Sequence, residues 1–135
     1  MYILGFPLLI IPLAIYNIMT FLVPVEWNVP VTSISMMSGG VWSVSYSDFL
    51  LAVGLVFLFL EIFKATRHGT RAIVDHLLST LLFIAALVEF LLVAQAATST
   101  FALLMAMCLV DVIAGYSVSI RAAQRDYTVE RGDMV

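Results

Sequence analysis

The feature that most constrains this chain is a succession of four long apolar segments. They cover about residues 2–23, 48–66, 72–94 and 99–121. A helix of about 20 apolar residues crosses a bilayer core about 30 Å thick, so each segment is long enough to be a membrane span. Hydrophobic residues make up 63% of the 135 residues and charged residues only 11%, whereas a soluble domain carries about 25% charged residues. The composition excludes a soluble monomer and a disordered chain, and it predicts an integral membrane protein.

Short connections between the apolar segments indicate the fold class. Only a few residues separate the second segment from the third, and the third from the fourth, so both pairs are expected to form antiparallel helix hairpins. Ser47 or Asp48 could cap the second helix, and Pro7 and Pro12 predict bends near the start of the first. We therefore predict an all-α integral membrane fold, a four-transmembrane-helix antiparallel bundle that forms a single domain.

Residues 24–47 form the one sizeable region outside the predicted spans. Apolar and small hydroxyl residues roughly alternate on both sides of the pair Gly39-Gly40, which adopts positive φ freely, so a short β-hairpin is predicted between the first and second helices. An isolated hairpin is marginal in water. It is therefore expected to lie on the outer face of the bundle with Trp27, Trp42 and Tyr46 at headgroup level, or to pair with another subunit. Its exposed edge could also bind a partner by strand addition.

The basic residues predict the orientation of the chain in the membrane. All six lie either around the connection between the second and third segments, at Lys64, Arg67 and Arg71, or from the end of the fourth segment onward, at Arg121, Arg125 and Arg131. The positive-inside rule places both regions in the cytoplasm. Both termini are then expected to be cytoplasmic, residues 122–135 form a short cytoplasmic tail, and the hairpin faces outward.

The predicted architecture is similar to that of small four-span bacterial inner-membrane proteins, many of which are accessory subunits. The resemblance covers architecture alone, and it transfers no residue and no activity. It implies a location in the bacterial inner (plasma) membrane.

Each predicted helix carries one strongly polar residue, and these are Asn17, Glu61, Glu89 and Asp111. Counting from the cytoplasmic ends at about 1.5 Å per residue places Asn17, Glu89 and Asp111 in one layer. Glu61 is shallower and can pair with Lys64, three residues later on the same helix face. A charged carboxylate near the centre of a membrane helix costs about 2.5–3.5 kcal/mol, so at least one of the two deep acids is expected to be protonated.

Three interpretations of the deep acids are open. Glu89 and Asp111 could share a proton or a cation, with Asn17 supplying an amide oxygen. They could instead be protonated acids that hydrogen-bond across helices and stabilise the bundle. In the third interpretation, one carboxylate meets a basic residue on the helix of a partner protein.

Several functional classes are excluded by what the sequence lacks. The net charge of −3 provides no basic stripe for nucleic acid. The single cysteine, Cys108, cannot form an internal disulfide, a CxxC pair or a thiolate zinc site. His68 and His76 are poorly placed for a haem, and no catalytic motif occurs. We therefore predict no metal, no cofactor and no enzymatic activity.

The leading hypothesis is a non-catalytic accessory or scaffold subunit of a larger bacterial inner-membrane complex. Such a subunit would contact the lipid bilayer and either other membrane subunits or further copies of itself. The alternative is a small proton- or cation-coupled transport component that uses Asp111 and Glu89. A membrane enzyme acting on a lipid or a quinone, and a holin-like pore former, are more remote alternatives.

Overall fold

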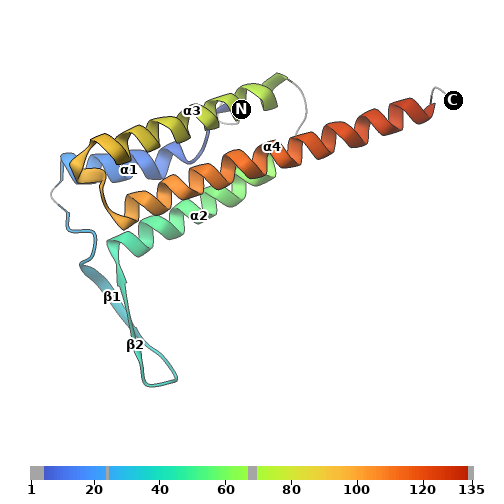
Figure 1. Ribbon diagram of the computed structural model, residues 1–135. Helices are drawn as coiled ribbons and strands as arrows, with labels where there is room; N and C mark the ends of the chain where they lie inside the picture. Colours follow the sequence, from blue (N-terminus) through green and yellow to red (C-terminus); the bar gives the residue numbers. More distant parts are fainter. Residues whose placement is uncertain (1–4, 24, 67–69, 134–135) are drawn as a thin grey trace.

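The computed structural model is a helical bundle from which a small β-hairpin projects (Figure 1). It describes residues 5–23, 25–66 and 70–133, leaving aside the side chains at 70–72, 119, 121–123, 125–131 and 133. The elements in chain order are α1 (Ile10–Phe21), β1 (Pro30–Ser35), β2 (Val41–Ser45), α2 (Tyr46–Lys64), α3 (Thr70–Leu92), the 3-10 turn η2 (Ala94–Ala96) and α4 (Ser99–Asp133).

Three of the helices are long and apolar enough to cross a membrane. The qualifying stretches are Tyr46–Lys64, Ile73–Leu92 and Ser99–Val118. They correspond to the second, third and fourth predicted spans. The predicted fold class is therefore confirmed as a mostly helical bundle with a two-stranded antiparallel hairpin, and with three helices that could be spans.

The first helix is shorter than the sequence predicted. It begins at Ile10 rather than near residue 2, and its 12 residues span only about 18 Å. Pro7 disfavours a helical conformation at Phe6, and the backbone of Phe6 and Leu8 instead contacts Lys64 and Glu61 of α2. The backbone forms turns just before the helix, in which the Ile10 N–H donates to the Pro7 carbonyl at 3.2 Å. Pro12 does not bend the helix interior, since it lies in the first turn, where a missing N–H costs nothing.

The four helices run alternately in opposite directions along the bundle (Figure 1). The segment that precedes α1 reaches Lys64 at the end of α2, through a hydrogen bond from Lys64 Nζ to the Phe6 carbonyl. The other end of α1 lies beside the end of α3, where Asn17 bonds Glu89. The hairpin joins the bundle at this second end, since β2 continues directly into α2. The predicted antiparallel arrangement of consecutive helices is therefore confirmed.

Helix α4 contacts each of the other three helices, and two glycines permit close approach. A Cβ atom placed on Gly54 of α2 would lie 2.9 Å from the Met107 sulfur, and one on Gly115 of α4 would lie 3.0 Å from the His76 ring. These distances are shorter than normal packing contacts, so the helix pairs α2–α4 and α3–α4 meet at positions without side chains. The helix extends to Asp133, so it continues beyond the predicted span at 99–121 into the predicted tail.

The hairpin has the predicted position and nearly the predicted strands. Met36 N–H donates to the Gly40 carbonyl at 2.8 Å, and Gly39 closes the turn with a φ of +89°. This left-handed conformation is the one that glycine adopts without strain. The cap of α2 differs from the expectation: Ser45, not Ser47, accepts from the Asp48 N–H, and Asp48 accepts from the Ser45 N–H in return. Because this capping box begins the helix at Tyr46, β2 ends at Ser45.

Candidate functional site

The four polar residues predicted at membrane depth, Asn17, Glu61, Glu89 and Asp111, lie in two groups at different levels of the bundle. The first group consists of Glu61, Lys64, Asp75 and Asp111, and is called the charged cluster below. The second is the pair Asn17 and Glu89, near the end of the bundle that carries the hairpin.

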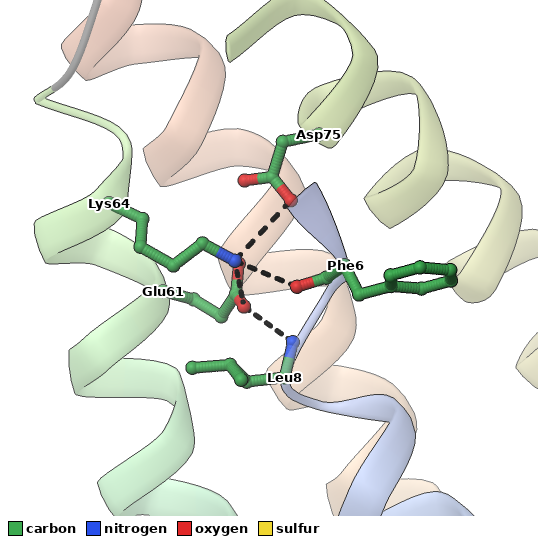
Figure 2. Close-up of polar contacts among 5 residues, drawn as sticks. All are labelled: Phe6, Leu8, Glu61, Lys64 and Asp75. Carbon is green, nitrogen blue, oxygen red and sulfur yellow. Dashed lines mark hydrogen bonds and ion pairs between the residues drawn. The ribbon is translucent and has the colours of Figure 1, made fainter. Parts of the chain in front are cut away.

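Lys64 is the centre of the charged cluster (Figure 2). Its Nζ atom lies 3.0 Å from Glu61 Oε1 and 3.5 Å from Asp75 Oδ1, and it donates to the Phe6 carbonyl at 2.7 Å. Glu61 Oε1 in turn accepts a hydrogen bond from the Leu8 N–H. One ammonium group therefore ties together the end of α2, the first turns of α3 and the segment that precedes α1.

The charged cluster is almost completely covered by protein. The side chains of Lys64, Glu61 and Asp75 are 8%, 1% and 8% exposed. Buried ion pairs gain little net stability, but removing one partner of such a pair typically costs about 3–5 kcal/mol. The predicted pairing of Glu61 with Lys64 is confirmed by these contacts.

Asp111 extends the charged cluster into the middle of α4. It is 5% exposed, interacts electrostatically with Glu61, Asp75 and Lys64, and has the Ser79 hydroxyl within hydrogen-bonding reach. Glu61 and Asp75 thus pair with the one lysine, and Asp111 is a third buried carboxyl group near them.

His76 borders the charged cluster but is held by packing. His76 is 8% exposed. Its ring lies beside Gly115 of α4, and the centre of the ring is 5.2 Å from the centre of the Tyr116 ring. Tyr116 also bonds the Thr80 hydroxyl at 3.2 Å. The His76 ring of α3 is therefore packed against both Gly115 and Tyr116 of α4.

The second polar group is a single contact between α1 and α3. Asn17 Nδ2 donates to Glu89 Oε2 at 3.3 Å and to the Leu13 carbonyl at 3.0 Å. Asn17 Oδ1 is buried and has no hydrogen-bond partner among the described residues. The predicted proximity of Asn17 and Glu89 is thus confirmed.

The predicted layer that joins Asp111 to these two residues is wrong. Asp111 lies level with Ser79 of α3, and Glu89 is ten residues farther along the same helix, which is about 15 Å. Depths counted from assumed span ends were too coarse, because the contacts between α3 and α4 set the relative level of their residues. The two acids therefore cannot share one proton or cation directly.

The predicted docking residues have different environments. Trp27 is packed in the bundle, with its ring stacked 5.1 Å from Tyr16 and its Nε1 donating to Thr20 Oγ1 at 3.1 Å. Trp42 and Tyr46 are 51% and 41% exposed. Trp42 and Tyr46 are therefore more accessible to a partner or to the lipid surface than the half-buried Trp27.

Among the predicted basic anchors, Lys64 is the one whose side chain the structure describes. Lys64 is buried in the charged cluster instead of forming a free surface anchor. Arg67 lies outside the described residues, and so do the side chains of Arg71, Arg121 and Arg125.

Sequence reasoning overlooked Asp75 as a partner of Lys64, because a carboxylate near the predicted start of the third helix is already explained by the helix dipole, although α3 begins earlier, at Thr70. The short connection between α2 and α3 was the signal that could have revealed it. A tight helix hairpin brings the end of one helix beside the start of the next. The backbone groups of Phe6 and Leu8 had no comparable signal in the sequence.

Within the described part of the chain, no group of three or more His, Cys, Asp or Glu side chains is arranged to hold a metal ion. Cys108 is a free, buried cysteine. Comparisons with known protein families, curated proteins and solved structures found no match to this chain. Its function is therefore argued from geometry and chemistry alone.

Proposed function

We propose that the protein is a membrane-embedded accessory or scaffold subunit of a larger assembly in the bacterial inner membrane. The observation that carries the proposal is the uncharged hairpin, which projects from the bundle with its strands exposed to solvent (Figure 1). It is the element best placed to contact another protein.

The outer surface of the bundle supports membrane embedding. Large apolar side chains of α2, α3 and α4 remain exposed, and examples are Phe59 at 60%, Leu81 at 60%, Leu92 at 78% and Ile113 at 57%. Soluble monomers rarely expose so much contiguous apolar surface. Lipid would cover these apolar side chains without removing polar groups from water.

The hairpin supports the accessory role. Strand β1 pairs only with β2 in the described sheet, so each strand has one edge without a β-sheet partner. Unpaired edges are templates for strand addition by another chain. The positive-inside rule and the distribution of basic residues support cytoplasmic termini, with the hairpin on the outer side.

Purification in mild detergent followed by native mass spectrometry tests the accessory role. We expect the full chain to carry an additional subunit or a second copy of itself. A variant in which residues 31–44 are replaced by a Gly/Ser linker, with the Ser45 cap retained, should lose that mass but keep its helical content. A lone monomer of the unaltered chain in every mild detergent would contradict the proposal.

The charged cluster favours a second candidate, a proton- or cation-coupled transport component. Its support is the presence of three buried carboxyl groups with one lysine, and of Asp111 about two-thirds of the way along the apolar part of α4. The separation of Glu89 from Asp111 restricts this candidate to Asp111 and its neighbours.

Proteoliposome flux measurements test the transport candidate. Asp111→Asn should abolish any proton or cation flux while the fold is preserved. Cys108→Ala, one turn away on the same helix, is the matched control and should leave the flux unchanged. Undiminished flux in Asp111→Asn would remove this residue from the mechanism.

A further inference from the structure

The hairpin has two chemically different faces. Residues directly opposite each other in an antiparallel pair project to the same face, and successive residues along a strand project to opposite faces. The strand register therefore defines an apolar face, formed by Thr32, Ile34, Trp42 and Val44. It also defines a serine face, formed by Ser33, Ser35, Val41 and Ser43.

The apolar face is largely uncovered. Ile34 is 45% exposed and Trp42 is 51% exposed, and Met36, next to the turn, is 49% exposed. A two-stranded hairpin is at best marginally stable in water. Its exposed apolar side therefore requires an apolar environment.

The charge of the hairpin favours lipid as that environment. No charged residue occurs between Glu26 and Asp48. The hairpin can therefore enter the boundary between headgroups and acyl chains without desolvating an ionised group, a step that would be costly. Trp42 and Tyr46 are residue types enriched at this depth, and both are exposed.

The direction of the hairpin also favours lipid. Strand β2 ends at Ser45 and α2 begins at Tyr46, so no linker separates the hairpin from a candidate span. Figure 1 shows the hairpin extending sideways from this end of α2, across the helix axes rather than along them. When α2 crosses a bilayer, the hairpin therefore lies along the membrane surface.

One buried side chain indicates which face turns toward the membrane. Val44 is 7% exposed, while every other residue of the two strands is exposed or half-buried. It belongs to the apolar face, at the base of the hairpin where β2 meets α2. The face that contacts the body of the protein is thus the apolar one. Near the start of α2, Phe49 is also 50% exposed.

We propose that the apolar face of the hairpin rests on the lipid surface beside α2 as an in-plane anchor. The serine face then points to water, and the strand edges remain open to a protein partner. This inference depends on the membrane embedding proposed above, and it adds a lipid-binding surface that the accessory role does not require.

Fluorescence quenching of two adjacent positions tests the inference. Ile34→Cys and Ser33→Cys, each in a Cys108→Ala background, are labelled with an environment-sensitive probe, and the full chain is reconstituted into phosphatidylethanolamine/phosphatidylglycerol vesicles. Doxyl groups attached to the lipid near the headgroup should quench the probe at position 34 several-fold more than the probe at position 33. Aqueous iodide should show the opposite order.

A third labelled position separates this inference from the proposed function. Val53→Cys lies on α2 and is 40% exposed at the native residue, so lipid quenching there reports insertion of the helix. Quenching at position 53 with equal iodide access at positions 33 and 34 would overturn the lipid-anchor inference and leave the membrane role intact. Protection of position 34 from both quenchers would indicate a protein cover and would also overturn it. Absence of lipid quenching at position 53 would instead contradict membrane embedding.

Discussion

At the residue scale, Lys64 has the largest structural role of any charged side chain described. It supplies the ammonium group to Glu61 and Asp75, and it also holds the backbone of the segment before α1 through the Phe6 carbonyl. The interaction therefore joins three parts of the chain at one end of the bundle. A neutral residue at this position would leave two buried carboxylates without their cation.

We predict that Lys64→Met lowers the free energy of unfolding by about 3–5 kcal/mol, because breaking a buried ion pair leaves an uncompensated charge. Thermal unfolding in a mild detergent measures the effect. Lys64→Arg keeps the charge and should lose less. The double variant Lys64→Met/Glu61→Gln should recover part of the loss, since one unpaired carboxylate is removed. Equal stability of Lys64→Met and the unaltered protein would show that the ion pairs contribute nothing to the fold.

At the element scale, the α2–α4 and α3–α4 contacts depend on glycines that face different neighbours. A Cβ on Gly54 would meet the sulfur of the flexible Met107 side chain at 2.9 Å and Leu104 Cδ2 at 3.3 Å, whereas one on Gly115 would meet the His76 ring at 3.0 Å. The histidine ring is also confined by Tyr116. A flexible thioether can move aside for a new methyl group, but an aromatic ring packed on two sides cannot.

The two glycines should therefore respond differently to the same substitution. Gly115→Ala is expected to destabilise the protein by about 1–3 kcal/mol through overpacking. Gly54→Ala should be neutral or slightly stabilising, because alanine gains about 1 kcal/mol of helix propensity over glycine. Comparative thermal unfolding of the pair measures the difference. Equal effects of the two substitutions would show that the His76 ring moves aside as readily as the Met107 side chain.

At the scale of the whole molecule, the hairpin and the connection between α2 and α3 lie at opposite ends of the bundle (Figure 1). The exposed residues Ser38 and Thr66 belong to these two ends. The basic residues follow the same division. No basic residue precedes Lys64 in the chain, and Lys64 lies at the end of α2 that is opposite the hairpin. The structure and the charge distribution therefore lead to one testable topology.

We predict that Ser38→Cys reacts with a membrane-impermeant maleimide added to intact cells, and that Thr66→Cys reacts only after permeabilisation. Both variants carry Cys108→Ala. The expectation follows from the positive-inside rule together with the positions of the two residues. Labelling of Thr66→Cys alone in intact cells would reverse the topology.

The sequence was sufficient wherever local chemistry decides the outcome. The apolar segments predicted α2, α3 and α4, and the alternation around Gly39 predicted the hairpin. It was insufficient for α1, whose start depends on how Pro7 and the preceding backbone meet α2. It was also insufficient for the candidate site, because the relative level of residues on different helices is a property of packing.

The sequence by itself determined a bundle of apolar helices, an uncharged hairpin and the point, at Lys64 at the end of α2, where basic residues begin. These features follow from length, hydropathy and turn chemistry, which act within a few residues. Only the tertiary structure decided which acids meet. Contacts at Gly115 and Ser79 place Asp111 with Glu61, Asp75 and Lys64, and leave Glu89 with Asn17. The physical reason is that the relative level of two helices is set by the fit of their side chains, and a shift of a few residues changes every polar partner.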